Sequence, residues 1–472
     1  MPSALIDRID TARQIVSSMH VPQSATQRPP GPRGWRESWE MMTGRRAAYE
    51  VFADLSRWHQ PVVHIGLAGE HTHVLFAPEA IWDVFVTNGR HTRKSLALQL
   101  TRPLLGNGLL TADGAEHLRH RRAIQPLFHG QRIAEYVGDM TAAAGITSDR
   151  WHDGATIEVT QAMSELTLDI IGRTIFGQQM RDDSSEVTAA LTAVLEGFGR
   201  GFGPVASPLS RISTRQRRRE RSAIETLDGI VEQMIARRVA ESGDGHDLLS
   251  MLMGAQDDSG EAAFTDDEVR DEAMTLVLAG HETTALAMTW AWLLLSHNPA
   301  VRAWLEEEVD NLTDEAVTFT DLKRLPRTYA VIAESMRLRP PAWIIGRWLD
   351  TDLRVSGWEL PRGSVVLASQ YSMHRDPRFW PQALEFRPQR WIDGAGRFDE
   401  RTPNVPRGVW FPFGFGTRRC IGEQFAWTEA VVLLATLARR WHVDVKAPLD
   451  IPMQSAITLR PAVPLPAVVH AR

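Results

Sequence analysis

The chain has 472 residues, of which 43% are hydrophobic and 23% charged, with a formal net charge of −6 at pH 7. This composition is ordinary for a globular protein with a large core. The acidic balance argues against a nucleic-acid-binding protein, which would be basic. The single cysteine, Cys420, excludes an internal disulfide and is consistent with a reducing compartment.

Residues 1–34 are expected to form an N-terminal extension with a proline-rich segment at 29–32. The extension contains Asp7, Arg8, Asp10 and Arg13 and lacks an apolar run, so no signal peptide is predicted. The most apolar stretch of the chain, 285–295, is far shorter than the ~20 residues needed to cross a bilayer. The sequence therefore predicts a cytoplasmic protein with no integral membrane span.

Residues 35–472 are expected to form one domain that is mainly α-helical with small β-sheets. Apolar periodicity predicts helices over 160–176, 186–196, 222–242, 265–297 and 329–339. Short strands are predicted at 61–65, 72–76, 365–369, 456–459 and 467–470. The glycine-rich segment 197–204 could form a mobile lid.

The predicted helix 265–297 is long enough to cross the whole domain. Thr265 and Glu268 have the spacing of a capping box. The apolar face is interrupted by Ala-Gly-His-Glu-Thr-Thr at 279–284, and polar residues inside a buried helix need a partner or a function. Gly280 is expected to open a groove for a small ligand, and the Thr283 hydroxyl can donate to the Ala279 carbonyl and bend the helix.

Two further pairs have helical spacing. Glu334 and Arg337 lie three residues apart, close enough to form an ion pair on one helix face. His117 and Arg121 lie one turn apart and could present two polar groups on the same side. Such pairs are common in helices, so neither identifies a function alone.

Cys420 lies in the segment Phe-Gly-Phe-Gly-Thr-Arg-Arg-Cys-Ile-Gly at 413–422, directly before a predicted helix from 423 to about 440. Lowering the pKa of a thiol from ~8.5 to below ~7 takes about 2 kcal/mol. A helix N-terminus supplies about 0.3–1 kcal/mol, helped by Arg418 and Arg419. Because a bound metal deprotonates a coordinating thiol outright, the segment fits a sulfur-ligated cofactor better than a free nucleophile.

The pattern Phe-x-x-Gly-x-Arg-x-Cys-x-Gly resembles the heme-binding loop of the cytochrome P-450 superfamily. All five positions match, at Phe413, Gly416, Arg418, Cys420 and Gly422. The resemblance implies heme b, iron protoporphyrin IX, with Cys420 as the axial thiolate ligand of the metal. It also implies a single large P-450-type fold, with the heme between the helix 265–297 and the helix that follows Cys420.

The resemblance further assigns roles to the central helix and to a structural network. Residues 279–284 resemble the family's oxygen-binding kink, which includes Ala279 and Gly280. On this basis Thr283 would donate a hydrogen bond to bound dioxygen, and Glu282 would help to relay protons. Glu334, Arg337 and Arg390 resemble a structural network that holds the cysteine loop in place.

The heme propionates need cationic or hydrogen-bonding partners. By motif position the candidates are His117, Arg121, Arg347 and Arg418. Phe413 is expected to pack near the thiolate.

The implied activity is that of a heme-thiolate monooxygenase, which inserts one oxygen atom of O2 into a hydrophobic molecule such as a terpenoid, fatty acid or polyketide. Electrons would come from a separate ferredoxin or flavodoxin with its reductase, because the chain has no flavin or iron–sulfur motif. A basic patch of Arg119, His120, Arg122 and Arg419 is expected to dock that partner. The protein is expected to be a monomer.

Three alternatives remain open from the sequence. A cysteine hydrolase could use Cys420 with one of the 16 histidines. A heme-binding sensor or carrier that is not an enzyme would keep Cys420 but would not need the motif at 279–284. A peroxide-driven hydroxylase would belong to the same family but would usually lack the acid and alcohol pair.

Overall fold

The computed structural model describes residues 28–32, 40–41, 45–67, 70–99, 101–177, 187, 190–191, 193–194, 214–240, 247–256, 260, 262–312 and 316–472. Most of the predicted N-terminal extension, most of the predicted helix 186–196 and the whole predicted lid 197–204 lie outside the described residues.

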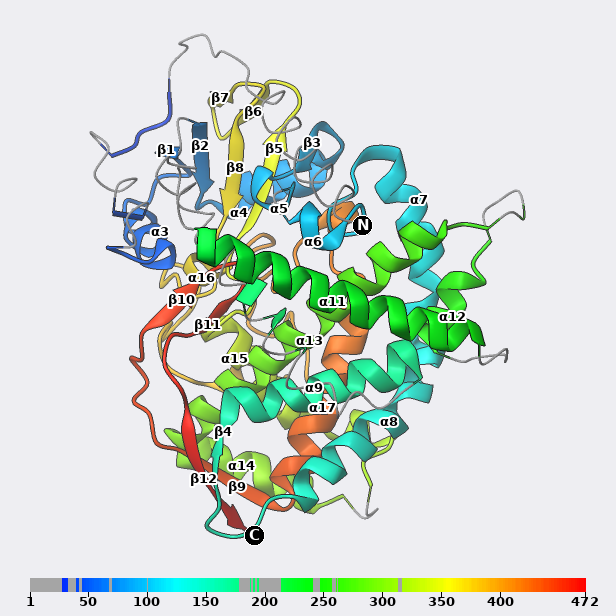
Figure 1. Cartoon of the computed structure of the whole chain (residues 1–472). Coiled ribbons are helices and arrows are strands. Elements are labelled where there is room, and N and C mark those ends of the chain that lie inside the picture. The colour runs from blue at the N-terminus through cyan, green and yellow to red at the C-terminus, as the bar shows by residue number, and fades with distance from the viewer. Residues whose placement is uncertain are drawn as a thin grey trace.

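Helices make up most of the described chain (Figure 1). The α-helices are α3 (Ala48–Ser56), α4 (Pro78–Trp82), α5 (Leu96–Gln99), α6 (Arg102–Leu105), α7 (Gly114–Ile124), α8 (Gly130–Asp149), α9 (Val159–Phe176), α11 (Thr214–Ala240), α12 (Leu248–Met253), α13 (Asp266–Ser296), α14 (Pro299–Asp310), α15 (Pro326–Leu338), α16 (Gln370–Met373) and α17 (Glu423–Ala438). The strands are β1 (Val62–Leu67), β2 (Glu70–Leu75), β3 (Thr92–Lys94), β4 (Thr156–Glu158), β5 (Ile345–Leu349), β6 (Leu353–Val355), β7 (Trp358–Leu360), β8 (Val365–Ala368), β9 (Trp441–Val445), β10 (Met453–Ser455), β11 (Leu459–Pro461) and β12 (Pro466–Ala471).

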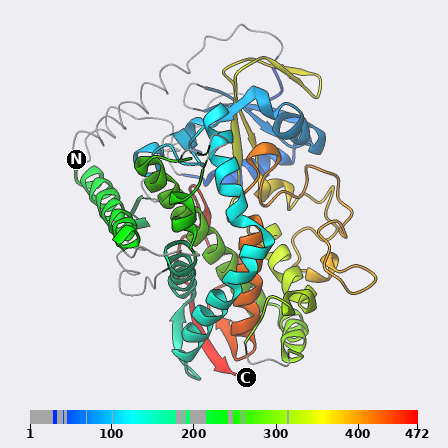
Figure 2. The ribbon, with the colours of Figure 1, turned by 90° about the vertical axis from the view of Figure 1, so that its right-hand side faces the viewer.

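The helices pack around α13, which contacts α9, α11, α15 and α17. A sheet in the order β1-β2-β8-β5-β3 lies at one end of the molecule, and β4-β12-β9 lies at the opposite end, near the C-terminus (Figures 1 and 2). The expected mainly α fold with small sheets is therefore confirmed. Within the described ranges, no helix has the length and apolar character needed to span a membrane.

The predicted long helix is present with the expected start. Thr265 caps α13, and its hydroxyl and the Glu268 carboxylate form the reciprocal capping box. By contrast, α11 begins at Thr214, eight residues before the predicted start at 222, because its arginine-rich first turns are good helix formers. The predicted strand at 456–459 is wrong for its first three residues: residues 456–458 form the turn between β10 and β11, closed by the Ala456 amide donating to the Thr458 carbonyl at 3.0 Å, and only Leu459 lies in a strand, β11.

A buried ion-pair network joins α15 to the chain that leads into the cysteine loop, residues 413–422. Arg337 donates from Nε and Nη2 to the two carboxylate oxygens of Glu334, each at 2.8 Å. Arg390 Nε donates to Glu334 Oε1 at 3.0 Å, and Trp391 Nε1 donates to Glu334 Oε2 at 2.9 Å. Glu334 and Arg337 are both fully buried. Their charges are thus compensated inside the core rather than by solvent.

The guanidinium of Arg337 also fixes a length of irregular backbone. Its Nη1 donates to the carbonyls of His374 and Ala383 at 2.8 and 2.7 Å. Its Nη2 donates to the carbonyl of Glu385 at 3.1 Å. One buried side chain therefore positions three separate points of the segment that precedes the cysteine loop.

Replacing Arg337 with Ala should destabilise the protein by about 3–5 kcal/mol, because it leaves the Glu334 carboxylate buried without its main partner. Urea unfolding of the purified holoenzyme measures the change, and heme content per chain reports on the cysteine loop. The exposed Arg387→Ala is a matched control, expected to change stability by less than about 0.5 kcal/mol. An Arg337→Ala protein as stable as this control would contradict the structural role.

Candidate heme-thiolate site

Cys420 lies between a short turn at Gly416–Arg418 and the start of α17. Gly416 has φ +66°, and a Cβ at this position would lie 2.6 Å from the Phe85 carbonyl oxygen, so only glycine fits without strain. The Cys420 amide donates to the Phe413 carbonyl at 2.9 Å. The ring of Phe413 packs against Trp427 of α17. These contacts hold the cysteine loop as a tight turn against α17.

Cys420 is exposed to solvent, although neighbouring protein atoms still desolvate its thiol. Burial raises the pKa of Cys420 to about 11, and the nearby Arg121 and Arg419 offset only part of this rise. Arg418, which was expected to favour the thiolate, pairs instead with Asp113. The thiol alone therefore stays protonated at neutral pH, whereas a coordinating metal would remove its proton.

The same observations count against a cysteine hydrolase. Such an enzyme needs a thiolate activated by a nearby base. Among the residues that the structure describes, no hydrogen bond joins a histidine to Cys420, and the raised pKa of this thiol disfavours free nucleophilic attack. The chemistry of the loop therefore favours metal ligation.

Helix α13 is open at its centre. Residues 269–278 and 284–295 are buried, but Ala279 is exposed, and Gly280, Glu282 and Thr283 are partly buried. The Thr283 hydroxyl donates to the Ala279 carbonyl at 2.7 Å, as predicted. Apart from the buried His281, this short stretch is less covered by the described residues than the helix on either side, which leaves a threonine and a carboxylate partly accessible to a bound molecule.

Gly280 does not open a ligand groove as expected. A Cβ at this position would lie 2.7 Å from Ile171 Cδ1 of α9, so the glycine instead allows α9 to pack closely against α13. The accessible residue is its neighbour Ala279.

Glu282 is held by the β10–β11 hairpin. The Thr458 hydroxyl donates to Glu282 Oε1 at 2.9 Å, and Arg460 Nη2 lies 2.9 Å from the same oxygen. Burial raises the pKa of Glu282, while Arg460 and Thr458 act in the opposite direction. The sequence analysis missed Arg460, because nothing local links residue 460 to the middle of α13.

Cationic side chains gather near the cysteine loop. Lys94, Arg121, Arg347 and Arg418 all lie close enough to His117 to lower its pKa, which burial and these charges bring to about 3. The predicted residues His117, Arg121, Arg347 and Arg418 are thus in one neighbourhood, and Lys94, which sequence reasoning missed, joins them. In the sheet, Lys94 of β3 is directly opposite Arg347 of β5.

This cationic cluster is only partly neutralised. Asp113 accepts from Arg418 Nη2 at 2.6 Å, but Arg418 Nη1 is buried without a hydrogen-bond partner among the described residues. Arg347 donates to its neighbour's carbonyl and lies over the Phe85 ring, and burial lowers its pKa to about 9. Since a buried cationic group needs a partner, the cluster fits an anionic ligand such as the propionates of heme.

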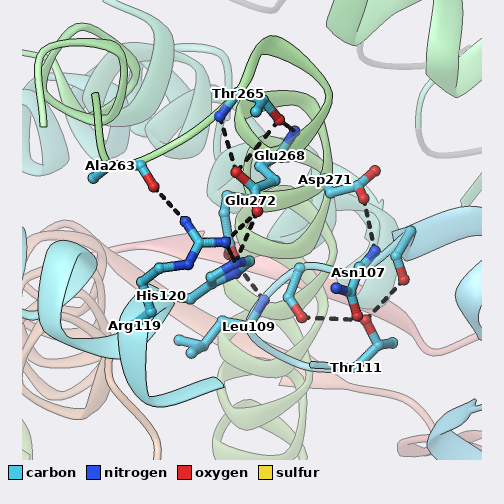
Figure 3. A network of polar contacts seen from close by, with 12 residues as sticks. Asn107, Leu109, Thr111, Arg119, His120, Ala263, Thr265, Glu268, Asp271 and Glu272 are labelled. Carbon is cyan, nitrogen blue, oxygen red and sulfur yellow. Dashed lines mark hydrogen bonds and ion pairs between the residues drawn. The ribbon is translucent and has the colours of Figure 1, made fainter. Parts of the chain in front are cut away.

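A polar network fastens α7 and the loop 106–111 to the first turns of α13 (Figure 3). The buried carboxylate of Glu272 accepts from the Leu109 amide at 3.0 Å and contacts His120 Nδ1 at 2.6 Å. Asp271 accepts from the Asn107 amide at 2.6 Å. A Cβ at Gly106, where φ is +53°, would lie 2.0 Å from the Asp271 carboxylate. The loop therefore sits directly on α13.

This network corrects the predicted basic patch. His120 is fully buried, and Arg119 is engaged with the Ala263 carbonyl and the Glu268 carboxylate. Arg122 is exposed, and the exposed Arg419 pairs with Glu423. Two of the four residues thus stabilise the contact between α7 and α13 rather than forming a free surface.

A second buried carboxyl, Glu429, lies between α17 and α13. Its side chain is fully buried, and burial raises its pKa to about 8, with Thr284 of α13 acting in the opposite direction. Sequence reasoning missed this residue, although a single acid beside the apolar run 430–435 was a usable signal.

Because the pKa of Glu429 rises on folding from 4.5 to about 8, the folded state binds its proton more tightly than the unfolded state. Its contribution to stability is therefore complete below pH 4.5 and is lost as the pH rises to 8. The glutamine side chain of Glu429→Gln is neutral at every pH. The free energy of unfolding of this variant, relative to that of wild type, should therefore rise with pH by at most about 1.4 kcal/mol per pH unit. Urea unfolding between pH 5.5 and 8.5 measures this, with the exposed Glu307→Gln as a control. A difference that stays constant with pH would contradict the burial of a neutral acid.

Comparisons with known proteins agree with this geometry. The family model described as Cytochrome P450 matches residues 29–465. Cyclooctatin synthase of Streptomyces melanosporofaciens is 36% identical over 388 residues, covering 82% of this chain and 83% of the relative. Pentalenene oxygenase of Streptomyces avermitilis is 31% identical over 416 residues, covering 88% and 90%. Cyclooctat-9-en-7-ol 5-monooxygenase of Streptomyces melanosporofaciens is 31% identical over 387 residues, covering 82% and 83%. The chain belongs to the cytochrome P450 family.

Proposed function

We propose that this heme monooxygenase oxidises an uncharged cyclic terpenoid at the open centre of α13. The observation that carries the proposal is the pairing of Glu282 with Arg460 and Thr458. Glu282 and Arg460 neutralise each other beside the open stretch, so among the described residues an apolar molecule would meet a paired charge there rather than a free one. The names of the three relatives, which refer to cyclooctatin, pentalenene and cyclooctat-9-en-7-ol, support a substrate of the same class.

The alternative substrate classes fit this stretch less well. A fatty acid carries a carboxylate, and burying it without a cationic partner costs several kcal/mol. Arg460, the cation near this stretch, is already paired with Glu282. An uncharged polycyclic molecule instead gains by burying its whole surface against apolar groups, at about 25 cal/mol per Å².

The family holds heme b through a cysteine, and Cys420 is the chain's single cysteine. When bound, the heme supplies O2 activation, which electron donation from the thiolate favours. We assign the propionates to His117, Arg121, Arg347 and Arg418, with Lys94 as a further cation. Phe413, Gly416 and Gly422 shape the turn that presents the Cys420 sulfur.

Within this assignment, Thr283 and Glu282 form a proton relay. The Thr283 hydroxyl donates to the Ala279 carbonyl, so it would have to rotate before it could donate a hydrogen bond to a molecule bound beside it. Glu282 Oε1 is occupied by Thr458 and Arg460, which leaves Oε2 as the atom that would carry a proton from solvent to Thr283. The presence of both groups favours an O2-dependent enzyme over a peroxide-driven hydroxylase or a heme carrier.

Electrons would come from a ferredoxin or flavodoxin with its reductase, because nothing in the sequence resembles a flavin or iron–sulfur motif. The exposed Arg122 and Leu118 of α7, together with Arg419, lie on the surface we assign to this docking. Function as a monomer and a cytoplasmic location stay predictions.

Thr283→Ala should uncouple oxygen consumption from product formation, lowering product per NADH oxidised by about tenfold, because the proton relay loses its last hydroxyl. Product and peroxide are measured with a surrogate ferredoxin system. Thr289→Ala is a matched control, since Thr289 makes the same bond to a carbonyl four residues earlier, at 2.7 Å, in the buried part of α13. Equal coupling in Thr283→Ala and wild type would show that Thr283 has no such role.

Pentalenene should bind at least tenfold more tightly than dodecanoate, because Arg460, the cation that the described residues place beside Glu282, is already paired with it. The shift of the Soret band on titration of the ferric holoenzyme measures both dissociation constants. Tighter binding of dodecanoate would reject the terpenoid assignment while leaving the monooxygenase chemistry intact.

A further inference from the structure

Helix α9 contacts α13 within the open stretch of α13. Three residues of α9, Ser164, Thr167 and Ile171, are three and four residues apart and so share one face of that helix. Ile171 lies against Gly280, where a Cβ would be 2.7 Å from its Cδ1. The other two form hydrogen bonds with His281. One face of α9 therefore meets α13 directly before the residues assigned to the proton relay.

His281 is bound to α9 at two points. Its Nε2 lies 2.7 Å from the Ser164 hydroxyl oxygen, and its carbonyl accepts from the Thr167 hydroxyl at 3.1 Å. The Thr167 hydroxyl also has the carbonyls of Met163 and Ser164 within reach, at 3.0 and 3.2 Å, so three acceptors share it. We call the two bonds to His281 the α9 clamp. Because the clamp binds both the side chain and the backbone of one residue, it restrains the rotation of α13 about its own axis.

The imidazole of His281 is an unusual choice for a buried position. The residue is 3% exposed, and its Nδ1 has no hydrogen-bond partner among the described residues. Buried polar atoms without partners are rare and call for an explanation. Burial lowers the pKa of His281 to about 4, so the ring is neutral at pH 7 and takes part in no charge pair. A leucine would fill this space without an orphaned nitrogen, so what the histidine adds is the directed bond to Ser164.

The next residue, Glu282, is the carboxylate of the proposed relay. Successive residues of an α-helix are turned by about 100°, so the direction of the Glu282 side chain follows from that of His281. Glu282 Oε1 accepts from the Thr458 hydroxyl at 2.9 Å and lies 2.9 Å from Arg460 Nη2. Besides burial, the charge of Arg460 lowers the pKa of His281, so the β10–β11 hairpin lies near both residues. Since hydrogen bonds weaken steeply with misalignment, a rotation of α13 would cost Glu282 both contacts.

We propose that the α9 clamp is a positioning device for Glu282: it sets the rotation of α13 that aims this carboxylate at the β10–β11 hairpin. Ser164 and Thr167 are then positioning residues, because they act on Glu282 only through His281. The effect of the clamp on turnover rests on the proposed function, whereas the positioning itself does not.

Urea unfolding of the full-length holoenzyme tests the proposal through a double-mutant cycle between Thr167→Val and Thr458→Val. No hydrogen bond joins these two threonines among the residues that the structure describes. Substitutions at uncoupled sites multiply their effects on the unfolding equilibrium constant within about twofold. Here the double variant should be more stable than that product by about fivefold, the size of one neutral hydrogen bond, because a displaced Glu282 has already lost its bond to Thr458.

Thr174→Val is the matched control. Thr174 lies in the buried part of α9 and donates to the Ile170 carbonyl at 2.8 Å, so its hydroxyl bonds within its own helix. Its cycle with Thr458→Val should multiply within about twofold. Ser164→Ala should show the same coupling to Thr458→Val as Thr167→Val does, and Ser164→Thr, which keeps the hydroxyl, should behave as wild type. Circular dichroism of each variant checks folding.

Turnover distinguishes a failure of this inference from a failure of the proposed function. With pentalenene and a surrogate ferredoxin system, Ser164→Ala should lower the product formed per NADH oxidised by about fivefold, and Ser164→Thr should restore it. A coupled cycle with an unchanged product yield would keep the α9 clamp and reject the relay role of Glu282. Cycles that multiply within about twofold for both Thr167→Val and Ser164→Ala, or equal coupling in Thr174→Val, would overturn the proposal.

Discussion

The structure depends on keeping one sulfur anion inside the protein. Burial is the main cause that raises the pKa of the Cys420 thiol to about 11, so a thiolate there needs a positive partner. In the assignment proposed above, the heme metal would provide that partner, and the rest of the loop would hold the sulfur toward it. This explains why Gly416 approaches the Phe85 carbonyl so closely and why Arg337 fixes the backbone upstream.

The charges near the cysteine loop and those at the open stretch of α13 are balanced in different ways. Arg347 and Arg418, together with Lys94, lie near Asp113, but Arg418 Nη1 is buried without a hydrogen-bond partner among the described residues, so this cluster can accept an anion. At the open stretch of α13, by contrast, Glu282 is matched by Arg460. This difference in charge balance is what the proposed propionate site and the proposed terpenoid site each require.

Patterns that are local in the chain were predictable. The cysteine motif, the capped helix α13 and the Glu334–Arg337 pair rest on short spacings, and these are the features that the sequence analysis placed correctly. Contacts between distant residues were not predictable. Arg460 reaches Glu282, Lys94 joins the propionate candidates, and Ile171 fills the space beside Gly280. Each depends on how separate elements pack, which no spacing along the chain encodes. The buried place of His120 was missed for the same reason.

The close seating of loop 106–111 on α13 has a consequence for protein engineering. Gly106 and Gly108 leave no room for even a methyl group beside Asp271 and Thr275, and the Glu272 and Asp271 carboxylates bind the loop's own amides. A chimera that imports this loop from another enzyme must therefore also import the opening turns of α13, and libraries that vary one without the other will mostly yield misassembled proteins.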